Sequence, residues 1–492
     1  MGSGVWVFSD MRRSRLLRSG TIAAVVALPA IPALTSQYGF SDDYSFLGYE
    51  QSTGELLREV AGGHQRPLAG LLCVIGRELV GTIDGLGWVR LVGLGGAIAL
   101  ALATAAAARS AGFSERFALT LALGVGLLPS VQLYAAWATL APCGWVSAAS
   151  MLASQQLVGT GASLSLARRA RVAALLLVSA LTYQPAVGFF VVGLVLALLS
   201  PRPRHEPRLL LERHLSALAI AVSGVFVWIV VARITINDGY RTTLAQRPGR
   251  KLSWFSTEVL NNAANTFDIT PSHLVEVVVM AMIAVVTVVV ARRQWRKLGR
   301  KQGILVAGML VLALPITYTP NLIVDETWAA YRTLAALSAL VVVFLLVAAR
   351  EVTQLIAIRA ARPRTRRRLD TAWSLAIAVG IVGVGGVVAT TMHRELVRPQ
   401  TKELAAFSAE LRATYADSPV TIAVRQLAAP PSPPARYDEF GVPSLAKEWV
   451  PVGIAHAVYR ADGRDPNAQH VLRLAPGEAA PAGATVIDIP PP

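Results

Sequence analysis

The sequence predicts an all-α polytopic membrane protein of about eleven transmembrane helices, followed by a small C-terminal extracytoplasmic α+β domain. Three observations lead to this class. Hydrophobic residues make up 54% of the 492 residues and charged residues only 15%, whereas ordinary soluble domains carry roughly 25% charged residues. Apolar runs of about 20 residues recur, and each is long enough to cross a hydrocarbon layer of about 30 Å. The segment 392–492 lacks such runs.

The net charge of +16 is distributed as the positive-inside rule requires, in short basic clusters between apolar runs. The clusters are Arg12–Arg18, Arg168–Arg171, Arg202–Arg213, Arg292–Lys301 and Arg350–Arg368. This distribution is typical of a topology signal and argues against nucleic-acid binding. It predicts a multi-pass protein of the cytoplasmic (inner) membrane, with residues 1–19 in the cytoplasm, 20–391 forming the membrane domain and 392–492 outside.

The first apolar run, about 20–37, lacks a small-residue cleavage site, so we expect an uncleaved first span. The mixed segment 38–88 then forms a large external loop. Further spans are expected at about 89–108, 117–138, 144–166, 214–233, 274–291, 303–319, 331–349 and 372–391. Between them, 234–273 and 320–330 are expected to be external loops.

The run 172–199 has basic residues at both flanks but is too short for two full crossings, since 28 residues of helix span only about 42 Å. Pro185 near its centre removes a backbone donor and breaks a helix. We therefore expect two short half-helices that meet at Tyr183-Gln184-Pro185. Irregular backbone at membrane depth survives only inside protein or beside a water-filled cavity, which makes this break a candidate site.

The C-terminal segment changes in kind. We expect a helix at 403–415, a proline-rich linker at 430–434, and strands at 420–424, 452–459 and 485–489. Cys73 and Cys143 are the only cysteines, and with no histidine nearby in the sequence they form no metal motif.

The strongest candidate for chemistry is the acidic pair Asp42 and Asp43, directly after the first span. Adjacent carboxylates suit a general base. The alternative interpretation is structural: the two residues would cap a helix or lie in a solvated loop. Whether a divalent metal joins them stays open, because two carboxylates and water would suit Mg²⁺ or Mn²⁺.

Other polar and aromatic residues are candidates for substrate binding. Arg66 offers a planar fork for phosphate or carboxylate, and Arg332 at a helix mouth would be expensive to bury without an anion. The alternative for Arg66 is that its side chain extends to the membrane interface. The alternative for Arg332 is an ion pair with Asp325 or Glu326. The full set of candidate binding residues is Tyr44, His64, Arg66, Tyr183, Gln184, Asp325, Glu326, Trp328 and Arg332.

Three short motifs carry a family resemblance over roughly residues 20–350. Asp42-Asp43-Tyr44 after a first span, Arg66-Pro67 at the loop end and the Tyr183-Gln184-Pro185 break resemble the membrane glucosyltransferases that modify bacterial O-antigen. That family belongs to the GT-C class of glycosyltransferases. The resemblance implies that an acidic residue of the first external loop, here Asp43 or Asp42, acts as or beside the catalytic base. The C-terminal segment, with Tyr437–Ser444 and Trp449-Val450-Pro451, has no counterpart in that family.

An enzyme of this kind would move a sugar from a polyprenyl-phosphate donor to a cell-envelope glycan or lipid acceptor, because nucleotide sugars are absent outside the cytoplasmic membrane. Arg66 and Arg332 could then hold the donor phosphate, while Trp328 or Tyr44 stacks on a sugar face. Two other classes stay open. A transporter or lipid-linked-sugar flippase would also use a broken helix, and a non-catalytic scaffold would use 393–492 as an external binding module.

Overall fold

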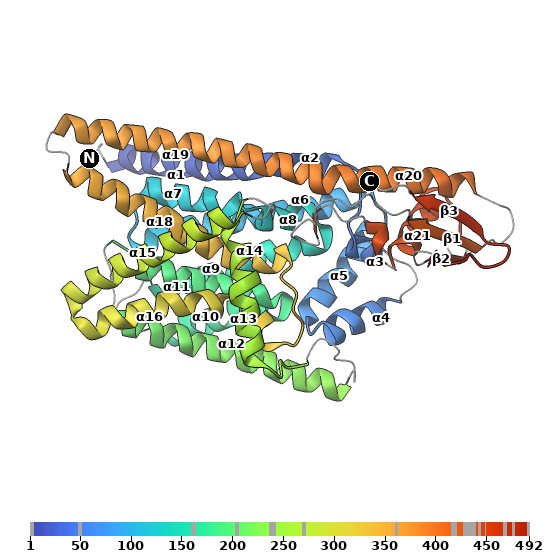
Figure 1. The fold of residues 1–492 in the computed structure, drawn as a ribbon, viewed down its shortest axis with the longest axis horizontal. Helices are drawn as coiled ribbons and strands as arrows, with labels where there is room; N and C mark the ends of the chain where they lie inside the picture. The colour runs from blue at the N-terminus through green and yellow to red at the C-terminus, as the bar shows by residue number, and fades with distance from the viewer. Residues whose placement is uncertain are drawn as a thin grey trace.

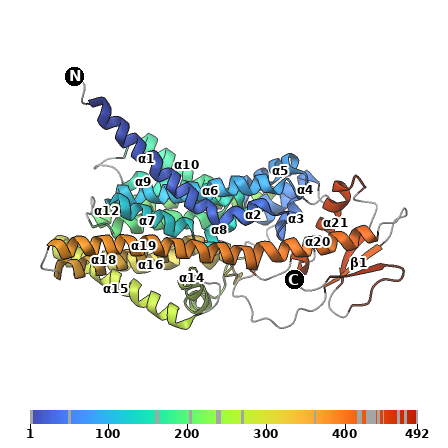
Figure 2. The same ribbon diagram turned by 90° about the horizontal axis from the view of Figure 1, so that it is seen from above.

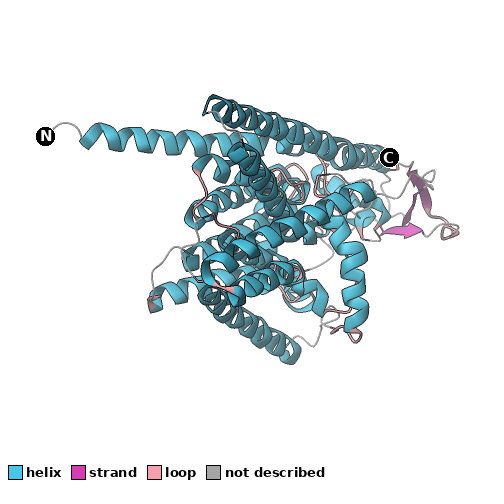
Figure 3. Cartoon of the chain, turned by 60° about the vertical axis from the view of Figure 1, so that its left-hand side comes forward, coloured by secondary structure: helices cyan, strands magenta, loops and turns pink. Residues whose placement is uncertain are grey.

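The computed structural model describes residues 4–47, 52–158, 164–201, 206–235, 243–267, 272–359, 363–414, 421–426, 439–440, 444–447, 449–465, 470–474 and 478–489. Long helices run side by side along the molecule, and the strands among the described residues lie at one end (Figures 1 and 3). Within these residues six helices are long and apolar enough to cross a membrane, and a bent pair would make a seventh. The multi-pass helical class is therefore confirmed, whereas the count of about eleven spans stays a prediction.

The membrane bundle is built from helices that match most of the predicted runs. Its helices are α1 (Gly4–Ala27), α2 (Ile31–Thr35), α6 (Leu86–Ala111), α7 (Glu115–Gly126), α8 (Pro129–Ala136), α9 (Ala141–Val158), α10 (Leu166–Thr182), α11 (Gly188–Leu198), α12 (Pro207–Thr235), α15 (His273–Leu298), α16 (Arg300–Thr317), α18 (Ala335–Arg359) and α19 (Pro363–Thr391). The predicted single span 117–138 is instead two helices, α7 and α8, bent by 60°. Pro129 begins α8 and pushes Leu128 out of the helical region, which explains the bend.

The predicted break within 172–199 is confirmed. Helix α10 ends at Thr182, Tyr183 is extended at φ −156° and ψ 99°, and a short 3₁₀ turn (Gln184–Val187) leads into α11. Pro185 sits in the first turn of the new segment, where its missing N–H leaves no bond unmade.

The predicted loops contain short helices rather than irregular chain alone. The first loop, 38–88, holds α3 (Asp42–Leu47), α4 (Thr53–Arg58), a π-helical turn (Glu59–Gly63) and α5 (Pro67–Val80). The later loops hold α13 (Pro248–Trp254), a π-helical turn (Phe255–Val259), α14 (Leu260–Ala264) and α17 (Thr319–Ile323). The predicted span 331–349 begins with a 3₁₀ turn (Tyr331–Leu334) that leads into α18. One isolated bridge, Leu244 to Val324, joins the two later loops.

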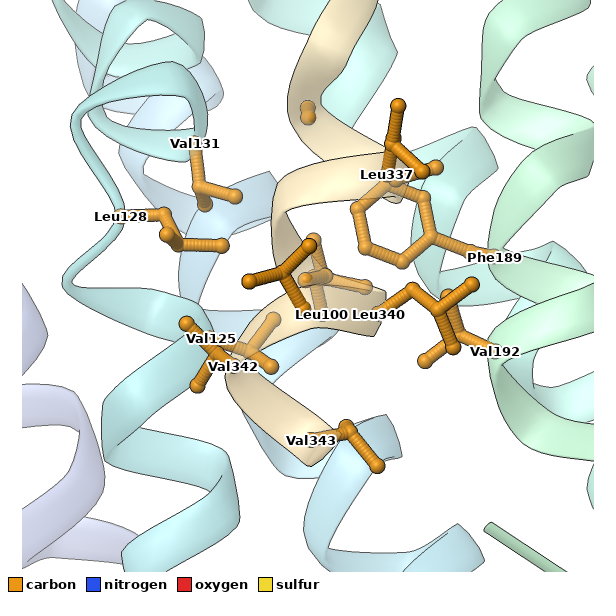
Figure 4. Packing of buried hydrophobic residues seen from close by; sticks show 14 of the residues in the cluster. Leu100, Val125, Leu128, Val131, Phe189, Val192, Leu337, Leu340, Val342 and Val343 are labelled. Carbon is orange, nitrogen blue, oxygen red and sulfur yellow. The ribbon is translucent and has the colours of Figure 1, made fainter. Parts of the chain in front are cut away.

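The bundle core is a continuous cluster of aliphatic and aromatic side chains. Figure 4 shows Leu100 of α6, Val192 of α11 and Leu340 of α18 meeting, and all three are fully buried. Because lipid tails are as apolar as leucine, close packing rather than exclusion of water holds such helices together. Gly96 and Gly144 allow α6 and α9 to touch, since a Cβ on Gly144 would lie 2.6 Å from the Gly96 carbonyl carbon.

The C-terminal unit is continuous with the bundle. A π-helical turn (Met392–Val397) carries α19 directly into α20 (Arg398–Ala413), so the predicted boundary at 392 falls inside one long helix (Figure 2). The remaining elements are β1 (Thr421–Gln426), a 3₁₀ turn (Ser444–Ala446), α21 (Val450–Ala461), β2 (His470–Leu474) and β3 (Thr485–Ile489). The strands form a sheet of order β2-β1-β3 in which both pairs are parallel.

The predicted strand 452–459 is wrong, because these residues form α21. Pro451 fits the first helical turn, and Val450, Ile454 and Val458 recur every four residues and pack into one buried cluster with the strands. Helix α21 is therefore the crossover that a parallel pair β1–β2 needs, which gives α/β layering instead of the expected α+β segregation. The predicted strands at 420–424 and 485–489 correspond to β1 and β3. The predicted linker 430–434 lies outside the described residues.

Candidate functional site

A cavity of about 470 Å³ lies where the first loop, the Tyr183 break and the C-terminal unit meet. Six of the predicted site residues line it: Asp42, His64, Arg66, Tyr183, Trp328 and Arg332. These residues come from four separate parts of the chain. The fold thus gathers most of the candidates into one space.

The two carboxylates of the acidic pair lie in different surroundings, and the turn before them contributes to this. Ser41 has a left-handed φ of 46°, which is uncommon for a residue with a side chain. Helix α3 begins directly after it, so Asp42 and Asp43 project in different directions. Asp42 is exposed and lines the cavity, with Ser41 Oγ donating to its Oδ1 at 3.3 Å. Asp43 is fully buried and does not line the cavity.

The Asp43 carboxylate closes the loop by accepting three backbone N–H groups. Phe40 donates at 3.1 Å, Thr139 at 2.9 Å and Ala138 at 3.4 Å. Burial raises the pKa of Asp43 to about 6, while the nearby Arg90 charge and the three N–H donors act in the opposite direction. Asp43 therefore has the contacts of an anchor that joins the first loop to the α8–α9 connection.

Arg90 of α6 holds the other side of this loop. Its side chain is buried, and it donates to the carbonyl oxygens of Ala33 and Ser36 at 3.2 Å each and to that of Tyr38. The guanidinium also lies 3.7 Å from the centre of the Tyr38 ring. These bonds satisfy carbonyls at the end of the first span that have no helical partner. Arg90 thus fixes the chain that leads into Asp42.

Arg332 lies between two indole rings. Its guanidinium carbon is 4.3 Å from the centre of the Trp328 ring and 4.5 Å from that of Trp137. Its Nη1 is 3.2 Å from Oε1 of Glu439, a fully buried residue that also accepts the backbone N–H groups of Tyr331 and Arg332. The charge of Arg332 is therefore paired inside the protein, with a partner from the C-terminal unit.

Arg66 is held by the broken helix. Its Nε donates to Oε1 of Gln184 at 3.0 Å, and its guanidinium carbon lies 4.9 Å from the centre of the Tyr183 ring. Gln184 also donates to the carbonyl of Gln65 at 2.9 Å, and the Tyr183 hydroxyl donates to the carbonyl of Arg332 at 3.2 Å. Gln184 does not line the cavity, so its hydrogen bond orients the Arg66 side chain and does not contact a ligand in the cavity. The break thus connects both arginines of the site.

The C-terminal unit supplies part of the cavity lining. Ser41 N–H donates to Ser444 Oγ at 2.9 Å, and Ser444 Oγ in turn donates to Gln400. The Glu403 carboxylate accepts the N–H groups of Ser444 and Leu445 at 2.8 and 2.9 Å. Because the Ser41–Ser444 bond lies directly beside Asp42, the C-terminal unit takes part in shaping the site.

Glu403 predicts a pH dependence for this contact. Burial raises its pKa to about 7, from an ordinary value of 4.5, although the two N–H donors lower it in part. The folded state then binds a proton that the unfolded state releases between these values, so stability falls as the pH rises from 4.5 through 7. We expect a higher melting temperature at pH 5.5 than at pH 8, and a smaller difference in Glu403→Gln. Thermal unfolding of the full-length protein tests this, with Glu410→Gln on the exposed face of α20 as control. An unchanged difference in Glu403→Gln would refute the assignment.

Besides Asp43 and Gln184, three further predicted residues do not line the cavity. Tyr44 is buried against the C-terminal core, and its hydroxyl accepts the Gly39 N–H at 3.0 Å, so it cannot stack on a sugar in this space. Asp325 and Glu326 are exposed beside Lys251, which donates to the Glu326 carbonyl. The Asp325 N–H donates to the Thr243 carbonyl at 2.8 Å, and these two acids thus belong to the contact between the later loops.

The geometry does not fit a metal held by the acidic pair. Asp43 already accepts three N–H groups in a closed pocket, whereas Asp42 faces the cavity. Among the residues described here, no three histidine, cysteine or acidic side chains are grouped to hold an ion. We therefore derive no step through Mg²⁺ or Mn²⁺.

Several lining residues were not singled out as site candidates from the sequence. They include Glu59, Trp137, Glu439, Ser444, Lys447 and Trp449. Four of these belong to the C-terminal segment that has no counterpart in the resembled family. Glu439 and Trp449 in an otherwise proline-rich stretch could have indicated that this segment contributes to a site. No local feature of the sequence shows, however, that the segment packs against the first loop.

No family model matches the sequence, and no curated protein matches it. Among solved structures, the chain is similar to ArnT from Cupriavidus metallidurans in the apo state, at 16% identity over 84% of this chain and 82% of that chain, with a TM-score of 0.43. ArnT bound to undecaprenyl phosphate gives a TM-score of 0.42 at 16% identity, over 83% of this chain and 82% of that one. The Archaeoglobus fulgidus oligosaccharyltransferase in complex with Zn and sulfate gives 0.42 at 12% identity, over 82% of this chain. This chain spans only 60% of that protein's length. Likenesses of this size establish neither a family nor an activity.

Proposed function

We propose that this chain is a membrane glycosyltransferase of the GT-C class. It would transfer a sugar from a polyprenyl-phosphate donor to a cell-envelope glycan or lipid acceptor on the outer face of the cytoplasmic membrane. One observation carries the proposal: a single cavity beside the membrane bundle joins a carboxylate, Asp42, to Arg66 and to the aromatic face of Trp328. That set matches a base, a phosphate ligand and a sugar platform.

In the proposed reaction an acceptor hydroxyl oxygen attacks the anomeric carbon of the donor sugar. The bond from that carbon to the phosphate oxygen breaks, and its electron pair leaves with the polyprenyl phosphate. Asp42 takes the hydroxyl proton, because it faces the cavity whereas Asp43 is enclosed by backbone N–H groups. Direct displacement of this kind inverts the anomeric configuration.

Arg66 is the proposed phosphate ligand. A planar guanidinium can offer two parallel N–H donors to a phosphate, and it would stabilise the negative charge that the leaving group gains. Gln184 and Tyr183 hold its orientation from one side. Arg332 is paired with Glu439 and positions Trp328 and Trp137, so its role is secondary.

We expect Arg66→Ala to weaken binding of undecaprenyl phosphate by about 10- to 100-fold. A hydrogen bond to a charged group contributes roughly 1.5–3 kcal/mol, and each 1.4 kcal/mol is about tenfold in affinity. The measurement is titration of the full-length protein in nanodiscs with undecaprenyl phosphate. Arg77→Ala, in the helix α5 that follows directly after Arg66 but outside the cavity lining, is the matched control. Equal affinities of the Arg66 variant and the wild type would rule out this phosphate site.

The transporter alternative predicts translocation without a covalent product. Proteoliposomes that contain polyprenyl-phosphate sugars extracted from the native membrane, together with an envelope glycan fraction, separate the two. Appearance of sugar on the glycan supports the transferase. Movement of the lipid-linked sugar across the bilayer with no transfer supports the transporter or flippase. A scaffold would do neither.

A further inference from the structure

One wall of the cavity comes from the C-terminal unit, and it carries two residues that the proposed reaction does not use. Lys447 and Trp449 both line the cavity, together with Ser444. Lys447 is partly buried, and Trp449 directly precedes α21 with 46% of its surface exposed.

This wall is fixed in place. Glu403 accepts the N–H groups of Ser444 and Leu445, and the Lys447 N–H donates to the Ser444 carbonyl at 2.9 Å. The Val450 N–H donates in turn to the Lys447 carbonyl at 3.2 Å. Bound ligand would therefore meet a preorganised backbone, which lowers the entropic cost of binding.

The two walls of the cavity face different surroundings. Arg66 and Tyr183 belong to the wall that joins the bundle, from which a donor with its tail in the lipid would arrive. Lys447 and Trp449 belong to the unit that extends beyond the bundle (Figure 1). Lys447 and Trp449 therefore belong to the part of the lining that a water-soluble second substrate could contact without entering the bundle.

The chemistry of this pair is specific. Lys447 makes no ion pair with any residue in the described part of the chain, so its ammonium group is available to a ligand anion. The exposed Trp449 indole offers an apolar face with a polar edge, which suits the face of a sugar ring. A cation beside an aromatic platform fits a carbohydrate that carries negative charge.

We propose that Lys447 and Trp449 form the acceptor subsite and that the acceptor is an anionic glycan, bearing a uronate or a phosphate group. This inference rests on the proposed function and adds the acceptor class to it. The Ser41–Ser444 bond connects the subsite to the residue next to Asp42, so a glycan bound there would place a hydroxyl near the base. Lys447 and Trp449 are specificity residues that touch the acceptor.

The test is equilibrium binding of defined oligosaccharides to the full-length protein in nanodiscs. Tetragalacturonate probes the uronate, a glycerol-phosphate trimer probes the phosphate, and maltotetraose is the neutral probe of matched length. We expect at least one anionic probe to bind about tenfold or more tightly than maltotetraose, with an affinity that falls as salt is raised. Lys447→Glu should abolish this preference, and Trp449→Ala should weaken binding of every probe.

Controls keep the outcomes distinct. Lys402→Glu reverses the charge of an exposed lysine of α20 that does not line the cavity, and it should bind as the wild type does. Equal binding of anionic and neutral probes, no binding of any probe, or an unchanged preference in Lys447→Glu would overturn the proposal. Undecaprenyl phosphate is titrated in parallel. Absence of glycan binding with intact binding of the lipid phosphate would contradict only the acceptor subsite. Failure to bind the lipid phosphate would contradict the proposed function itself.

Discussion

Asp42→Asn is expected to lower sugar transfer by about 10²- to 10⁴-fold, the range that a general base contributes. The amide keeps the size of the side chain and cannot take the acceptor proton. Since Asp42 is exposed and bonded only weakly to Ser41 Oγ, the melting temperature should stay close to that of the wild type. Transfer by the protein in nanodiscs, measured with donor lipid from native membranes, gives the rate.

Asp84→Asn is the matched control, because Asp84 is an exposed acid of the same loop that does not line the cavity. It should keep the wild-type rate. Full transfer by a well-folded Asp42→Asn variant would exclude Asp42 as the base, and a loss of transfer in both variants would indicate a general effect of loop charge.

Asp43→Ala is expected to act on stability. It leaves the N–H groups of Phe40, Ala138 and Thr139 without their acceptor, and each buried unsatisfied group costs about 1–3 kcal/mol. We expect destabilisation of about 3 kcal/mol or more, seen as a large fall in melting temperature and in the yield of folded protein. The residual folded fraction is also expected to transfer poorly, because the turn at Ser41 that aims Asp42 is no longer held.

Asp42→Ala is the comparison for this effect, and its melting temperature should change little. Both variants replace an aspartate by alanine at neighbouring positions. A difference in their melting temperatures therefore comes from the contacts of each side chain and not from the loss of an acid as such. Equal melting temperatures for Asp43→Ala and the wild type would contradict the anchoring role, and the base could then be either residue.

Local features of the sequence were enough to predict the bundle and its break. The length of the run 172–199 and the position of Pro185 are local constraints, and the structure places the break at Tyr183 as expected. The prediction of a strand at 452–459 is wrong because β-branched residues favour strands. The four-residue spacing of Val450, Ile454 and Val458 instead places them on one face of a helix, and this face packs into the buried cluster of the C-terminal unit.

The division of the acidic pair could not be predicted from the sequence. It depends on N–H groups at 138 and 139, almost a hundred residues away, and on a left-handed turn at Ser41 that the sequence does not mark with glycine. The partner of Arg332 was missed for the same reason. Asp325 and Glu326 are its nearest acids in sequence, but Glu439 reaches it because the C-terminal unit packs against the first loop.

The most direct measurement is the profile of lipid-linked sugars and envelope glycans in cells that lack this protein and are complemented with the wild type or with Asp42→Asn. We predict that cells with the Asp42→Asn variant accumulate one polyprenyl-phosphate sugar and lose one glycan modification, as the deletion does, while the wild type restores both. Restoration of both by Asp42→Asn at equal protein level would contradict the account.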